Sequence, residues 1–136
     1  MAVKTPARKV ACKIGVRRAY EPAAADDGLR VLVDRLWPRG VTKARARIDL
    51  WLKDMAPSHT LRRMVHGDPS KWKAFVAAYA RELKREPAKS ALEDLRDRSK
   101  SEPITLVYAA RDETHNHAIL LKRWLERKSQ RPRRRV

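Results

Sequence analysis

The chain has 136 residues, a length that fits one domain and can bury a core without disulfides. Hydrophobic residues make up 43%, which argues against a wholly disordered chain, and a single cysteine, Cys12, excludes an internal disulfide and a cysteine-based zinc motif. The formal net charge is +17. Residues 1–9 carry +3 and residues 127–136 carry +6, so the body between them holds +8. A positive charge of this size attracts polyanions and anionic substrates, although an arginine-rich surface that only faces solvent gives the same net charge.

The charge and the apolar pattern divide the chain into three parts. We expect a flexible basic lead-in over residues 1–9, a single α/β domain over residues 10–128 and a disordered basic tail over residues 129–136. No apolar run reaches the length of a membrane span or a signal peptide. We therefore expect a cytoplasmic protein without a membrane partner.

The first half of the chain predicts three strands and a short helix. Alternating apolar residues indicate a strand over residues 10–17, and the continuous apolar run 31–33 indicates a strand over Arg30–Asp34 that is covered on both faces. Pro38 and Gly40 end regular structure, so residues 34–40 form a loop. Thr42 can cap a short helix through Arg47. A third strand over Ile48–Leu52 then leads into a loop at 53–57.

The second half predicts helices around one strong strand. Ser58 can cap a helix that stops at Gly67, and Asp68-Pro69 is typical of the next helix start. That helix has one apolar face: Trp72, Phe75, Val76, Tyr79 and Leu83. Glu86-Pro87 begins a further helix, Ile104–Tyr108 forms the last strand, and a final helix runs over Thr114–Lys128. Strands separated by helices predict a three-layer α/β fold: a mostly parallel sheet with helices on both faces.

Candidate site residues gather in three loops that follow strands. Ligands of open parallel sheets bind beyond the carboxyl ends of the strands, and the loops 34–40, 53–57 and 108–117 lie there. We predict that Asp34, His115 and His117 are catalytic, with Asp34 orienting the pair and a neutral histidine moving protons. The predicted substrate-binding residues are Arg35, Trp37, Arg39, Lys53, Arg111 and Asn116.

Each of these assignments has a structural alternative. Arg39 and Arg111 can grip a phosphate or carboxylate beside the amino end of the last helix, or they can only pair with nearby aspartates. Asp34 can be a structural ion-pair partner, and tryptophans in such loops are more often packed than stacked on a ligand. His115 and His117 do not share a helical face, so we predict no metal. No phosphate loop, nucleophile elbow or dinucleotide fingerprint is present, which leaves the cofactor unknown.

Three stretches resemble the YeaO-like proteins of domain of unknown function 488: residues 30–40 (RVLVDRLWPRG), 49–58 (DLWLKDMAPS) and 108–118 (YAARD followed by ETHNHA). They occur in order within a match that covers about residues 10–127. The resemblance implies a three-layer α/β fold and supplies no activity. The wider group has His-Cys-His-Arg where this chain has His115-Asn116-His117-Ala118, so any thiol chemistry of that branch does not transfer.

Two functions from different classes follow. The first hypothesis is an enzyme that acts on a small anionic or phosphate-bearing substrate at the carboxyl edge of the sheet. The alternative is a non-catalytic nucleic-acid-binding protein that uses its basic body and tail, although no helix-turn-helix pattern is present. The sequence does not set the oligomeric state.

Overall fold

The computed structural model describes residues 13–65 and 68–127, which form a four-stranded sheet with all strands parallel. The strand order is β1 (Ile14–Arg18), β4 (Ile104–Tyr108), β2 (Leu29–Leu32) and β3 (Leu50–Trp51). β4 pairs with both β1 and β2, and all five of its residues are buried. The predicted parallel sheet and α/β class are confirmed, because the apolar runs of β2 and β4 are covered on both faces.

The ends of three strands differ from the prediction. β2 covers Leu29–Leu32 rather than Arg30–Asp34, and the carboxylate of Asp34 accepts the backbone N–H of Ala109 in the loop beyond the strand. β1 reaches Arg18, while residues 10–12 of its predicted range, with Cys12, lie outside the described residues, as do both predicted tails. β3 has two paired residues, although the pattern predicted a strand over 48–52. The reason is local: the carboxylate of Asp49 accepts the backbone N–H of Arg30 at 2.8 Å. A side chain therefore takes a donor that a longer ladder with β3 would use.

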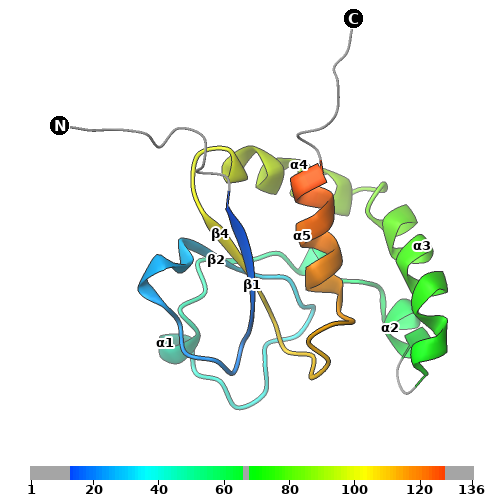
Figure 1. Ribbon diagram of the computed structural model, residues 1–136, viewed down its shortest axis with the longest axis horizontal. Helices are drawn as coiled ribbons and strands as arrows, with labels where there is room; N and C mark the ends of the chain where they lie inside the picture. Colours follow the sequence, from blue (N-terminus) through cyan, green and yellow to red (C-terminus); the bar gives the residue numbers. More distant parts are fainter. Residues whose placement is uncertain (1–12, 66–67, 128–136) are drawn as a thin grey trace, which may run out of the picture.

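The larger core covers one face of the sheet. Inward side chains of the strands pack against α2 (His59–Val65), α3 (Trp72–Glu82), α4 (Ala88–Ser99) and α5 (His117–Arg127). The predicted apolar face of α3 is confirmed, with Phe75, Tyr79 and the following Leu83 all buried. α5 lies alongside β1 and β4, and α2 and α3 stand outside it (Figure 1). None of the described helices is long and apolar enough to cross a membrane.

The other face carries a thin, partly polar layer made by the short helix α1 (Lys43–Ala46) and the 3-10 turn η2 (Ala25–Asp27). The buried guanidinium of Arg30 donates to Asp27 Oδ2 at 2.6 Å and to the carbonyl of Ala46 at 2.9 Å. Burial raises the pKa of Asp27, but hydrogen bonds from Ala24 and Arg30 and the charge of Arg17 outweigh it, so the pKa lies below its ordinary value. This ion pair fastens both elements to the sheet.

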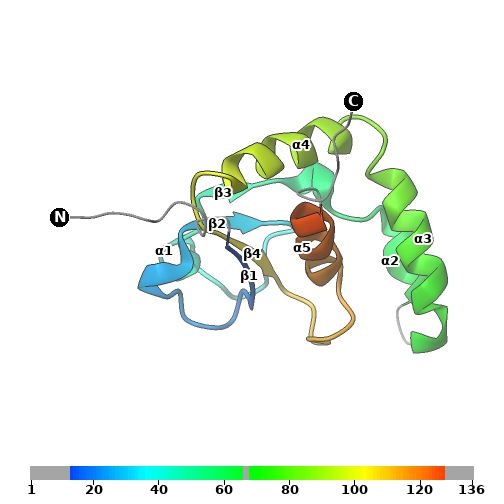
Figure 2. The ribbon, with the colours of Figure 1, turned by 45° about the horizontal axis from the view of Figure 1, so that its top comes forward.

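The helix starts follow the predicted capping residues. Thr42 accepts the N–H of Arg45 and Ser58 accepts that of Leu61, each at 3.2 Å. The predicted helix stop at Gly67 lies outside the described residues. A 3-10 turn, η4 (Pro69–Lys71), precedes α3. α1 lies at one end of the molecule, and α2 and α3 lie at the other (Figure 2).

Candidate functional site at the carboxyl edge of the sheet

The loops that leave β2 and β4 converge at Asp34. Asp34 Oδ2 accepts the backbone N–H of Ala109 at 2.9 Å, and Asp34 Oδ1 lies 3.1 Å from Nε2 of His117 at the start of α5. The same His117 nitrogen lies 2.9 Å from the carbonyl oxygen of Val33. Residues 75 or more positions apart in the sequence are thereby joined at one edge of the sheet, where the strand pattern predicted the site.

The side chains of Asp34 and His117 point into the protein and contact its own groups. Their side chains are only 16% and 13% exposed. Both atoms near His117 Nε2 are acceptors, so this nitrogen carries the ring proton, and its hydrogen bond is directed at Val33 rather than at Asp34. The ring packs edge-on against Tyr79 at 6.1 Å between centroids. Burial raises the pKa of Tyr79 well above its ordinary value, and the protonated hydroxyl donates to Met55 O. Asp34 and His117 therefore tie loops to the core.

The amino end of α5 is closed by side chains of the protein itself. Asp112 Oδ1 accepts the backbone N–H groups of Thr114 and His115, each at 2.9 Å. Asn116, which is 4% exposed, accepts the N–H of Ile119 at 3.0 Å and donates to the carbonyl of Asp112. The bonds from His115 and Thr114 lower the pKa of Asp112 to about 2. A carboxylate and an amide oxygen thus accept three of the N–H groups near the amino end of α5, where an anionic ligand was expected.

The two predicted catalytic histidines lie in different surroundings. His117 is the first residue of α5. The predicted helix start at Thr114 is wrong, because the buried side chain of Asn116 caps the first turn. His115 precedes the helix with a half-exposed side chain, and its ring packs edge-on against Trp72 at 5.2 Å. Within residues 13–65 and 68–127, no three His, Cys, Asp or Glu side chains are placed to hold a metal ion.

The predicted substrate-binding arginines differ in their contacts. Arg35 donates to the carbonyl of Ala56 at 3.1 Å. Arg39 and Arg111 are exposed, and neither forms an ion pair with a described residue. A pocket of about 200 Å³ lies beside Arg35, and neither Arg39, Arg111 nor His115 lines it. The pocket wall is formed by Arg35, Asp54, Ala56, Tyr79, Glu82, Leu83, Arg85, Glu86, Pro87 and Ala88.

The tryptophans and Lys53 pack on the thin layer of the sheet. The indole N–H of Trp37 donates to Val41 O at 2.6 Å and that of Trp51 donates to Asp34 O at 2.8 Å. The two rings meet edge to face at 5.5 Å, and Lys53 Nζ lies 4.2 Å from the Trp51 ring. These contacts pack each half-buried ring against the protein, and ligand binding by Trp37 stays a prediction.

Two residues of this edge were missed by the sequence reasoning. Arg18 donates to the carbonyls of Ala110 at 2.9 Å and Ala109 at 3.1 Å, and its guanidinium lies 5.0 Å from the ring of Tyr20. The Tyr20 hydroxyl donates to the carbonyl of Arg39 at 3.1 Å. The signal was present, because Arg18 ends β1 and Tyr20 lies in the loop after it, and the loops after the other strands had already been singled out.

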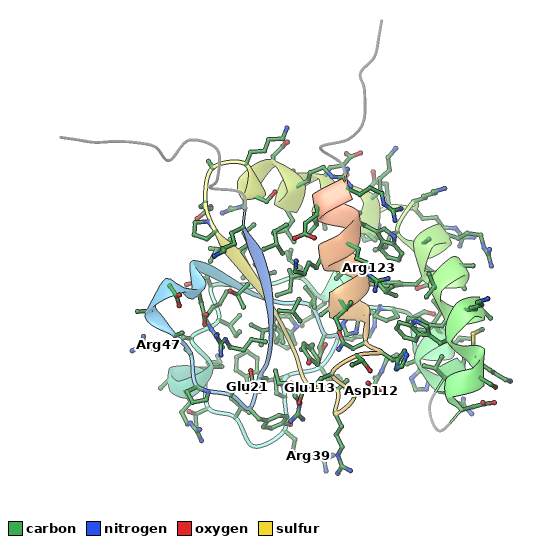
Figure 3. All side chains as sticks on the ribbon, in the orientation of Figure 1. Glu21, Arg39, Arg47, Asp112, Glu113 and Arg123 are labelled. Atoms are coloured by element: carbon green, nitrogen blue, oxygen red, sulfur yellow. The ribbon has the colours of Figure 1, made fainter. Side chains whose placement is uncertain are left out.

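An unbalanced basic segment adjoins this edge, and we define it by Arg39, Lys43, Arg45 and Arg47. All four residues are exposed, none forms an ion pair with a described residue, and no Asp or Glu lies between residues 35 and 48. Buried Ala46, which accepts from Arg30, anchors the segment. Figure 3 shows Arg47 beside α1, Arg39 at the lower edge of the molecule below the loop of Asp112 and Glu113, and Arg123 on α5.

The parallel sheet, its helical layers and its polar carboxyl edge define a small three-layer α/β domain. The chain belongs to the YeaO-like proteins of domain of unknown function 488, and the family described as the inactive DUF488-N3 subclade matches residues 13–135. The uncharacterized protein YeaO of Escherichia coli K12 is 41% identical over 112 residues, which cover 82% of this chain and 96% of YeaO. The uncharacterized protein Rv3073c of Mycobacterium tuberculosis H37Rv is 40% identical over 109 residues, which cover 80% of this chain and 90% of that protein. No solved structure matches.

Proposed function

We propose that this protein is a non-catalytic nucleic-acid-binding protein whose principal contact surface is the basic segment. The observation that carries this proposal is the set of exposed cations Arg39, Lys43, Arg45 and Arg47, which no described acidic side chain balances. Closely spaced Lys and Arg side chains bind phosphates and release counterions, which is the main source of affinity in such complexes. The six basic residues within 127–136 add further charge at the end of the chain.

The same edge offers little support for the enzyme hypothesis. Asp34 and His117, the two predicted catalytic groups that meet, already bind backbone groups of Ala109 and Val33. The N–H groups of Thr114 and His115 bind Asp112, and that of Ile119 in α5 binds Asn116. An anionic substrate would have to displace the protein's own oxygens from these groups. The description of the subclade as inactive agrees with a binding role.

A charge-removal experiment tests the proposal. The variant Arg39→Gln/Lys43→Gln/Arg45→Gln removes three cations and keeps Arg47, whose positive φ of 49° makes a change there a conformational one as well. The matched control, Lys84→Gln/Lys89→Gln/Arg123→Gln, removes three exposed cations from α5 and the surroundings of α4. Binding of fluorescein-labelled 20-nucleotide DNA, both single-stranded and duplex, is followed by polarisation across a salt series.

We expect the basic-segment variant to lose affinity for DNA. The negative slope of log K against log salt should become shallower by about 2 to 3, because each phosphate contact contributes roughly 0.7 to 0.9 to its magnitude. The control should change the slope by less than about 1. Equal losses in the two variants would mean that only the net charge attracts DNA. No measurable binding by the unmodified chain would overturn the proposed function.

A further inference from the structure

The exposed large apolar side chains of the described residues lie at the carboxyl edge. Tyr20 is 43% exposed in the loop after β1, and Leu36 is 68% exposed in the loop after β2. Single exposed apolar residues are normal on protein surfaces. Tyr20 is distinguished by how its ring is held and by what lies beside it.

The Tyr20 ring is fixed from two directions. Its hydroxyl donates to the carbonyl of Arg39, and the Arg18 guanidinium lies over the ring. Arg18 is itself held by hydrogen bonds to the carbonyls of Ala109 and Ala110. An aromatic side chain that is already ordered loses little conformational entropy when it takes up a partner. The guanidinium on the ring adds cation–π stabilisation.

The charges around Tyr20 favour an anionic partner. The hydrogen bond between Tyr20 and Arg39 places the ring directly at the first residue of the basic segment. Two acids, Glu21 and Glu113, lie on this side of the molecule (Figure 3), and Glu21 lies 3.7 Å from Arg17, which offsets its charge. A chain of phosphates along Arg39, Lys43 and Arg45 would therefore pass beside an exposed aromatic face.

We infer that the nucleic acid bound by the basic segment is single-stranded and that one unpaired base stacks on Tyr20. This inference rests on the proposed function and specifies its ligand. Base pairing and stacking bury the flat faces of bases within a duplex, whereas every base of a single strand can present its face to an aromatic ring. Leu36, in the same loop as Arg39, supplies further apolar surface at this edge.

The test compares three proteins on two ligands. Tyr20→Leu keeps an apolar side chain and removes the aromatic face, whereas Tyr20→Phe keeps the face and loses only the bond to the Arg39 carbonyl. Each is titrated with labelled (dT)20 and with a labelled 20-base-pair duplex, after circular dichroism has checked folding. We expect the unmodified chain to prefer (dT)20, and Tyr20→Leu to lose about 5- to 100-fold affinity for it.

Tyr20→Leu should leave duplex affinity and the salt slope unchanged, because no charge is removed, and Tyr20→Phe should retain most of the affinity for (dT)20. Equal binding of (dT)20 by the Leu variant and the unmodified chain, or a preference for duplex, would overturn the base-stacking inference. The proposed function would still stand in that case if the basic-segment variant lost affinity. If Tyr20→Leu does not fold, the Tyr20→Phe variant is compared on the two ligands instead. Tighter binding of (dT)20 than of duplex by this variant supports the inference. Tighter binding of duplex overturns it.

Discussion

The carboxyl edge of the sheet and the basic segment that adjoins it differ in how their polar groups are satisfied. Around Asp34, Asn116 and His117, most donors and acceptors bind one another across the exits of β2 and β4, and Asp34 Oδ1 accepts no hydrogen bond from a described residue. Along the basic segment, Lys43 and Arg45 find no acidic partner among the described residues. The first arrangement holds loops in place, whereas the second leaves charge available to another molecule. A residue type that suggests catalysis in a sequence can therefore be assigned a role only when its hydrogen-bond partners in the fold are known.

The largest effect on stability is expected from Asp34→Ala at the carboxyl edge. This change removes a charged acceptor, leaves the N–H of Ala109 without its partner and should cost about 2–3 kcal/mol of the free energy of unfolding. His117→Gln is the matched comparison, because an amide can still donate to Val33 O, and it should cost about 1 kcal/mol or less. Urea denaturation measures both. An unchanged midpoint for Asp34→Ala would contradict the loop-tying role and return Asp34 to the functional candidates.

A smaller loss is expected from Asn116→Ala. The buried amide caps α5 and bridges to the carbonyl of Asp112, so its removal should destabilise the protein by about 1–2 kcal/mol. Asn116→Asp keeps the capping oxygen for Ile119 and loses the donor to Asp112, so it should recover part of the loss. Thermal denaturation compares the variants, and DNA binding serves as the second readout. A fall in DNA affinity without a fall in stability would place Asn116 in the binding surface instead.

The smallest expected effect is on stability at acidic pH. The pKa of Asp112 is lowered to about 2 by the N–H groups of His115 and Thr114, so its stabilising contribution is present above the ordinary value of 3.8 and is lost as the pH falls toward 2. Asp112→Asn keeps an acceptor but does not titrate. The stability difference between the unmodified chain and this variant should therefore shrink between about pH 4 and about pH 2. A difference that stays constant over this range would mean that the Asp112 charge contributes nothing to capping.

Much of the fold could be predicted because local patterns and packing agree. The apolar runs of β2 and β4 match strands covered on both faces, and Thr42 and Ser58 cap the helices that follow them. The buried pair of Arg30 and Asp27 could not be foreseen, since nothing in the sequence says that a loop folds back over the sheet. The start of α5 was missed because Thr114, Asn116 and Asp112 all compete as caps, and tertiary burial of Asn116 decides among them.

The positions of the candidate site residues could be predicted better than their contacts. Asp34 and His117 meet where the carboxyl ends of the strands predicted, because the rule depends only on strand direction. Which atoms face the protein and which face solvent depends on side-chain contacts between distant segments. Arg39 and His115 stay outside the pocket beside Arg35 for that reason. Their predicted roles in catalysis and substrate binding remain predictions.

Amide NMR of the ¹⁵N-labelled chain tests the central claim most directly, because it reports on the carboxyl edge and on the basic segment in one experiment. Two titrations are compared, one with (dT)20 and one with inorganic phosphate. We predict that (dT)20 shifts the signals of Tyr20 and residues 39–47 and leaves residues 111–117 almost unchanged, while phosphate shifts neither set strongly. Shifts that centre on residues 111–117 with both ligands, with residues 39–47 unaffected, would contradict the account. They would identify the amino end of α5 as an anion receptor.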